Sequence, residues 1–79
     1  MNILITGAAG YVGSHTVHAL LKSKFSANVK IIAYDNLSTG FASSIPPQVQ
    51  LVQADIRDTE KLSRCLQEYK INAVLHFAA

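Results

Sequence analysis

The chain has 79 residues, 49% of them hydrophobic and 15% charged, with a formal net charge of +2. This length allows one small domain. The Lys and Arg residues form no run or stripe, so no surface that binds nucleic acid or an anionic membrane is predicted. The single cysteine, Cys65, indicates a reducing compartment, and no signal peptide or membrane-spanning stretch is recognised, so a cytoplasmic protein is expected.

The first half of the chain predicts a strand, a helix and a second strand. Residues 3–5, Ile-Leu-Ile, form a short apolar run that ends before Gly7, as a buried parallel strand does. Residues 11 to about 24 have apolar side chains at helical spacing, and residues 29–34 predict a strand that ends at Asp35. The apolar face expected of this helix consists of Val12, Thr16, Ala19 and Leu20.

A polar loop separates this half from the second. Residues 36–48 contain glycine and two consecutive prolines, which forbid a continuous helix. A third strand is predicted over 49–54, a second helix over 58 to about 70 and a fourth strand over 73–77. The stripe expected to face the core from the second helix consists of Leu62, Cys65, Leu66 and Tyr69.

This alternation of strands and helices predicts an α/β fold with a parallel sheet and right-handed crossovers. About four strands are expected, in the order 3-2-1-4. The crossovers then place the first helix on one face of the sheet and the second helix on the other.

The segment GAAGYVG, residues 7–13, lies between the first strand and the first helix. Gly7 lets the chain leave the strand, Gly10 lets a diphosphate approach the backbone, and Gly13 lets the helix pack closely. The unpaired N–H groups at a helix start favour an anion. The spacing departs from the Gly-x-Gly-x-x-Gly fingerprint, so an ordinary turn of small residues is an alternative.

Asp35 favours the binding interpretation over the turn. It follows Gly13 by 22 residues, close to the ~20 expected for a carboxylate that binds the ribose hydroxyls of a dinucleotide. The same carboxylate would repel a 2′-phosphate. The sequence therefore predicts NAD as the cofactor, in preference to NADP.

Four segments in series resemble the N-terminal part of the extended short-chain dehydrogenase/reductase family: TGAAGYVGSHT, YDNLSTG, ADIRD and VLHFAA. Together they are most similar to its nucleotide-sugar epimerase and dehydratase branch, and the resemblance covers essentially the whole chain. It implies a Rossmann-type NAD-binding domain. Residues 1–79 would be the N-terminal part of that domain, with the catalytic and substrate-binding part absent.

The resemblance also implies which residues bind NAD. Asp35 would hold the adenosine ribose, Asp55 would accept a hydrogen bond from the adenine amino group, and the N–H of Ile56 would meet a ring nitrogen. The residues that would wrap the pyrophosphate are Gly7, Gly10, Tyr11, Val12 and Gly13. The adenosine side would be lined by Asn36, Leu37, Ser38, Thr39 and Gly40, and the segment beneath the cofactor would be Phe77, Ala78 and Ala79.

The activity implied by the resemblance is that of an isomerase of galactose metabolism, which interconverts UDP-glucose and UDP-galactose through a 4-keto intermediate. Such an enzyme is expected to be a homodimer when complete. Ala79 stands where many epimerases have glycine, which leaves an NAD-dependent dehydratase or decarboxylase as an alternative. The family's Tyr-x-x-x-Lys pair does not occur here, since Tyr69 and Lys70 are adjacent. A non-catalytic NAD-binding module, with or without a regulatory role, is the other alternative. The isolated chain is expected to be marginally stable, or to associate through its fourth strand or its uncovered faces.

Other reactive side chains are assigned structural roles. His15 and His18 are three residues apart, with no carboxylate or thiol at ligand spacing, so no metal site is predicted. His76 lies in an apolar strand and is expected to be an interior histidine. Cys65 is expected to pack in the core, and Asp58 to cap the second helix.

Overall fold

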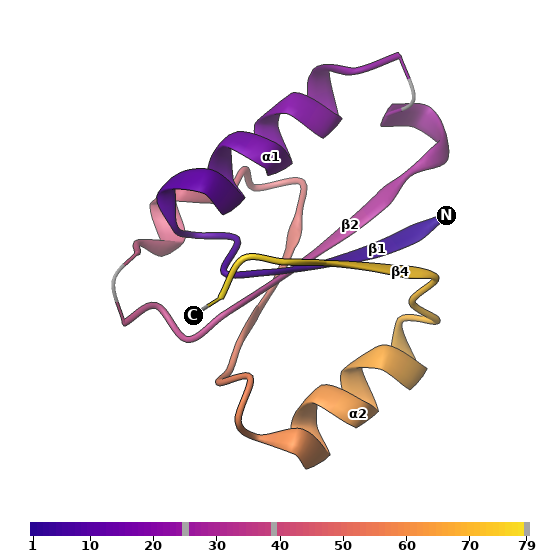
Figure 1. Ribbon diagram of the computed structural model, residues 1–79. Helices are drawn as coiled ribbons and strands as arrows, with labels where there is room; N and C mark the ends of the chain where they lie inside the picture. Colours follow the sequence, from indigo (N-terminus) through magenta and orange to yellow (C-terminus); the bar gives the residue numbers. More distant parts are fainter. Residues whose placement is uncertain (25, 39, 79) are drawn as a thin grey trace.

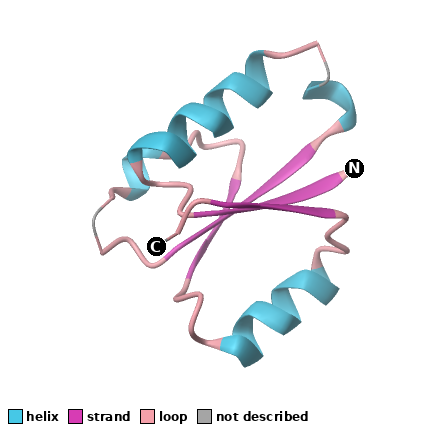
Figure 2. Cartoon of the chain, in the orientation of Figure 1, coloured by secondary structure: helices cyan, strands magenta, loops and turns pink. Residues whose placement is uncertain are grey.

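The computed structural model describes residues 1–24, 26–38 and 40–78. Within these ranges four strands, β1 (Asn2–Thr6), β2 (Lys30–Asp35), β3 (Gln50–Gln53) and β4 (Ala73–His76), form a parallel sheet in the order β3-β2-β1-β4. The helices α1 (Tyr11–Lys22) and α2 (Thr59–Glu68) cover opposite faces of it (Figure 1). Two short 3-10 turns, η1 (Ser26–Asn28) and η2 (Ala42–Ser44), belong to the connections (Figure 2). The predicted fold class and strand order are confirmed.

The strands β1 and β2 form the buried centre of the sheet. In their parallel register Leu4 lies beside Ile32 and Ile5 beside Ala33, and none of these four side chains has exposed surface. Successive side chains point to opposite faces. Leu4 and Ile32 therefore pack with Tyr34 on the α2 side, whereas Ile5 and Ala33 pack on the α1 side. Continuous apolar strands of this kind are typical of parallel sheets that are covered on both faces.

Helix α2 packs as predicted. The Asp58 carboxylate accepts a hydrogen bond from the Lys61 N–H at 3.1 Å, so it caps the helix. Cys65 is 4% exposed and lies in the core cluster with Leu4, and burial raises the pKa of its thiol. Leu62, Leu66 and Tyr69 pack against the same cluster.

Helix α1 lies at the predicted position but buries a different face. Val17 has no exposed surface and Gly13 is buried, whereas Val12 is 56% exposed and Ala19 is also exposed. The predicted face is therefore wrong, although Leu20 does pack against the core. The physical reason is Gly13, which presses directly against the turn that follows β1. A Cβ at this position would overlap the carbonyl oxygen of Gly7.

His76 is exposed, so the prediction of an interior histidine is wrong. Side chains alternate along β4. Ala73 and Leu75 pack against the core on the α1 side, whereas Val74, on the opposite face with His76, is 48% exposed. The exposure of His76 follows from the position of β4 at the edge of the sheet, where the α2 core cluster does not include it.

Candidate functional site

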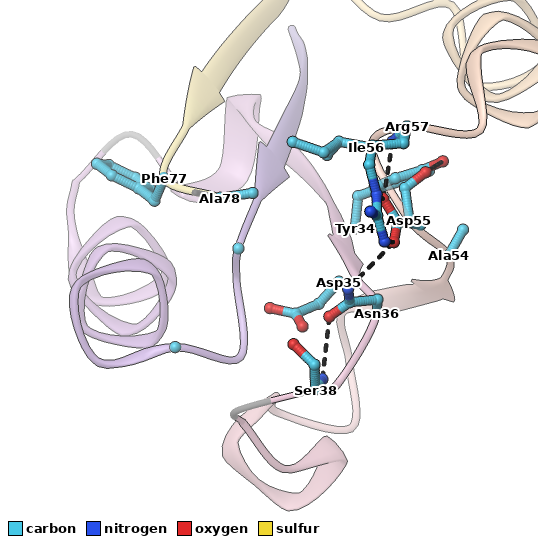
Figure 3. Close-up of a pocket in the computed structure, with 12 residues that line it drawn as sticks. Tyr34, Asp35, Asn36, Ser38, Ala54, Asp55, Ile56, Arg57, Phe77 and Ala78 are labelled. Atoms are coloured by element: carbon cyan, nitrogen blue, oxygen red, sulfur yellow. Dashed lines mark hydrogen bonds and ion pairs between the residues drawn. The ribbon is translucent and has the colours of Figure 1, made fainter.

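An open cleft of about 380 Å³ lies at the carboxyl ends of the strands. This edge of a parallel α/β sheet is where ligands bind. Figure 3 shows that the segments that follow different strands contribute side chains to the cleft. The lining residues are Gly7, Gly10, Tyr34, Asp35, Asn36, Ser38, Ala54, Asp55, Ile56, Arg57, Phe77 and Ala78.

The turn after β1 forms the floor of the cleft. Gly7 has a φ of +67°, and a Cβ there would lie 2.7 Å from the backbone nitrogen of Ala78, so both conformation and space require glycine. The N–H of Gly10 donates to the Gly7 carbonyl at 3.1 Å, and Gly10 then begins α1 without a side-chain cap. The predicted role of Gly7 in the turn is thereby confirmed.

The first turn of α1 presents unpaired backbone donors. In the described part of the chain the N–H groups of Tyr11, Val12 and Gly13 have no acceptor, as at most helix starts. No acidic side chain lies in this turn to neutralise the positive end of the helix dipole. The side chains of Tyr11 and Val12 do not line the cleft, Gly13 has no side chain, and Tyr11 is 81% exposed. Their contribution is therefore the backbone, in a geometry that binds anions.

The Asp35 carboxylate joins the glycine turn to the end of β2. Its Oδ2 accepts a hydrogen bond from the Ala9 N–H at 2.9 Å, and its Oδ1 accepts one from the Leu37 N–H at 2.7 Å. Leu37 has a φ of +61°, an uncommon conformation for a residue with a side chain. A carboxylate offers about four lone-pair positions, so about two remain for a ligand in the cleft.

The loop after β2 packs onto the glycine turn. A Cβ on Gly40 would overlap the Ala9 carbonyl oxygen, so this glycine lies against the turn and not in the cleft. Leu37 likewise packs against the core on the α1 side. Asn36 and Ser38 do line the cleft, and the Ser38 N–H donates to Asn36 Oδ1 at 2.9 Å. Thr39 lies outside the described residues.

The turn after β3 forms a second polar wall, on which Asp55 faces Asn36 (Figure 3). The Asp55 carboxylate accepts hydrogen bonds from the Arg57 N–H at 2.8 Å and from the Arg57 guanidinium at 2.8 and 3.1 Å. These bonds hold the pKa of Asp55 well below its usual range and raise the pKa of Arg57. The N–H of Ile56 has no acceptor among the described residues. An ionised acceptor therefore lies beside a free donor. The Tyr34 hydroxyl donates to the Asp55 carbonyl at 3.1 Å, and burial raises the pKa of this phenol.

The remaining wall follows β4. The Thr6 hydroxyl accepts hydrogen bonds from the N–H groups of Phe77 at 3.1 Å and Ala78 at 3.5 Å, and it shares a third with His76 Nδ1 at 2.6 Å. This buried hydroxyl holds the backbone of Ala78 against the glycine turn, where the Ala78 nitrogen is the atom nearest to the position of a Cβ on Gly7. Phe77 is 41% exposed. Ala79 lies outside the described residues.

Three lining residues were not predicted: Tyr34, Ala54 and Arg57. Tyr34 immediately precedes Asp35 on β2, and Ala54 immediately precedes Asp55 just after the end of β3. Arg57 lies two residues after Asp55, and an opposite charge at this distance could have indicated an ion pair. The pair is present, with 2.8 Å between Arg57 Nη2 and Asp55 Oδ2.

The two histidines of α1 take no part in the cleft. His15 Nδ1 lies 2.8 Å from the Tyr11 carbonyl oxygen, and its ring lies against that of Tyr11 at a tilt of 44°, with 4.5 Å between centroids. Among the described residues no three His, Cys, Asp or Glu side chains come together as a metal site requires. In the same ranges, no helix has both the length and the apolar character needed to cross a membrane.

Residues 3–79 match the sequence model of the NAD dependent epimerase/dehydratase family. The chain belongs to this family. The resemblance predicted from the four segments is therefore confirmed. The sequence of the chain is 42% identical to that of UDP-glucose 4-epimerase from Azospirillum brasilense over 76 residues. These aligned residues cover 96% of this chain and 21% of that enzyme.

Two solved structures from this family have the same fold. UDP-glucose 4-epimerase from Thermus thermophilus, in complex with NAD, superimposes with a TM-score of 0.88 and 37% identity, over 100% of this chain and 24% of the enzyme. dTDP-glucose 4,6-dehydratase from Bacillus anthracis, also in complex with NAD, superimposes with a TM-score of 0.90 and 34% identity, over 100% of this chain and 27% of that enzyme. The chain thus spans about a quarter of the length of the family members it matches.

Proposed function

We propose that residues 1–79 form the NAD-binding N-terminal portion of a nucleotide-sugar epimerase. The observation that carries this proposal is the Asp35 carboxylate, which two backbone N–H groups hold at the cleft beside the start of α1. A fixed acceptor for ribose hydroxyls next to unpaired donors for a diphosphate is the arrangement that a dinucleotide requires.

The residues of the cleft fit NAD on their own chemistry. The N–H groups at the start of α1 would hold the diphosphate, and the free lone pairs of Asp35 would accept the ribose hydroxyls. Asp55 and the Ile56 N–H offer an acceptor and a donor side by side, which match the amino group and neighbouring ring nitrogen of adenine. Ala78 leaves room beneath the cofactor. The remaining predicted contacts would come from Asn36, Ser38, Thr39, Phe77 and Ala79, and through packing from Leu37 and Gly40.

In this proposal the chain binds and orients, and does not itself react. When bound, NAD supplies reversible hydride transfer at C4 of the sugar. The Tyr and Lys that move the hydroxyl proton would belong to the portion of the family members that this chain does not span. With that portion, we propose interconversion of UDP-glucose and UDP-galactose through a 4-keto intermediate, in a homodimeric enzyme.

A dehydratase is the second candidate, because the dTDP-glucose 4,6-dehydratase of B. anthracis superimposes as well as the epimerase does. Both of these enzymes are in complex with NAD, so the NAD site described here fits either one. A protein that includes the missing portion would separate the two. UDP-galactose formed from UDP-glucose supports the epimerase, and loss of water from a nucleotide-linked glucose supports the dehydratase.

The NAD site is tested by calorimetric titration of the chain with NAD and NADP. We expect NAD to bind and NADP to bind more weakly, because Asp35 would repel the 2′-phosphate. Asp35→Asn places an amide NH2 group against the N–H of either Ala9 or Leu37, and should weaken NAD binding about tenfold or more. Glu60→Gln, which removes an exposed carboxylate on α2, should leave binding unchanged. A folded chain that does not bind NAD would overturn the proposal.

A further inference from the structure

The Asp55 carboxylate has no free acceptor position in this structure. Oδ1 accepts from the Arg57 backbone N–H at 2.8 Å and from Arg57 Nε at 3.1 Å. Oδ2 accepts from Arg57 Nη2 at 2.8 Å and from Asn36 Nδ2 at 3.4 Å. These four donors use the four lone-pair positions that a carboxylate offers. An adenine amino group can therefore bind Asp55 only if one of the donors leaves.

The Asn36 amide is the donor most easily displaced. Its contact is the longest of the four and involves a neutral group. The two guanidinium contacts are shorter and charge-assisted, and they form a fork that approaches both carboxylate oxygens (Figure 3). The backbone N–H of Arg57 belongs to the turn itself and stays in place.

We propose that Arg57 is a positioning residue for the adenine subsite. Its fork fixes the plane of the Asp55 carboxylate, and the incoming amino group takes the place of the Asn36 amide on Oδ2. This inference rests on the proposed NAD site. The Arg57 side chain is 87% exposed, so its removal takes no contact from the core.

The consequence is selection of the purine. Adenine presents an amino donor beside a ring-nitrogen acceptor, which complements the Asp55 acceptor and the Ile56 donor. Hypoxanthine presents an oxygen acceptor beside an N–H donor, and it is mismatched at both positions. The mismatch at Asp55 requires a carboxylate that is correctly turned, and the hydrogen bonds from Arg57 provide this orientation.

The experiment compares dissociation constants for NAD and nicotinamide hypoxanthine dinucleotide in the wild-type chain and in Arg57→Ala. The wild-type chain should prefer NAD. Arg57→Ala should lower this preference about two- to fivefold, the range for an exposed ion pair, through weaker binding of NAD. Arg57→Lys should not restore it, because one ammonium group cannot bind both oxygens as a fork. Arg64→Ala removes an exposed arginine of α2 outside the cleft and should change neither constant.

The outcomes separate this inference from the proposed function. If Arg57→Ala weakens the binding of both dinucleotides equally, or leaves the ratio of their dissociation constants unchanged, Arg57 does not position Asp55, although the proposed NAD site still holds. Tighter NAD binding by Arg57→Ala would mean that the guanidinium competes with the base, which also overturns the inference. If the folded wild-type chain binds no NAD, the proposed function fails and this inference fails with it.

Discussion

Replacement of Gly13 by alanine should destabilise the chain, although alanine is the better helix former. In an exposed helix interior this change stabilises by about 1 kcal/mol. At position 13 the new Cβ would overlap the Gly7 carbonyl oxygen and lie 2.8 Å from the Gly7 carbonyl carbon and 2.9 Å from Ala8 Cα. All three are backbone atoms, so no side chain can rotate away and α1 must move off the turn. Overpacking costs about 3 kcal/mol at the upper end of its usual range. After the gain in helix propensity is subtracted, the free energy of unfolding should fall by about 2 kcal/mol.

The measurement is urea-induced unfolding followed by circular dichroism at one fixed chain concentration. Gly10→Ala is the matched control, because it makes the same change where the new Cβ would meet only the Gly7 carbonyl oxygen, at 3.3 Å. We expect Gly10→Ala to change the free energy of unfolding by less than about 1 kcal/mol. If Gly13→Ala unfolds at the same urea concentration as wild type, or at a higher one, α1 does not press on the turn and the reasoning is refuted.

Three further predictions concern the second helix, the acid response and the sheet edge. Asp58→Ala should lower the free energy of unfolding by about 1 kcal/mol through loss of the cap, and Asp58→Ser should recover most of it in the same urea assay. Arg57 depresses the pKa of Asp55 in the folded chain below its ordinary value of 3.8. The ionised Asp55 therefore stabilises the fold above pH 3.8, and this stabilisation is lost as the pH falls toward the pKa of the folded chain. The melting temperature of Asp55→Asn should therefore fall less than that of wild type below pH 3.8. The isolated chain should associate through the edge strand β4, where Val74 is exposed. Sedimentation should therefore show an average mass that rises with chain concentration, and the rise should be smaller for Val74→Lys. A monomer at all concentrations would contradict this prediction.

The helices differ in how far their packing could be predicted. In α2 the apolar residues Leu62, Cys65 and Leu66 stand among polar ones, so hydrophobicity alone identifies the buried face. In α1 apolar residues occur on more than one side, and hydrophobicity does not choose between them. The choice is made by Gly13, because the helix can approach the turn most closely where it has no side chain. Close packing at Gly13 is expected from the glycine segment, but the apolar face was predicted from side chains alone, and that face was therefore wrong.

The same distinction applies to the site. Asp35 could be predicted because the lengths of a helix and a strand set the distance between the glycine turn and the next strand end. The hydrogen bonds of the Asp55 carboxylate could not be predicted from the sequence. They depend on a turn that folds Arg57 back onto the carboxylate and on the approach of Asn36 from another strand end. Spacing along the chain thus indicates which strand ends meet at the cleft. It does not indicate how many acceptor positions remain free there, and for Asp55 that number decides what a purine must displace in order to bind.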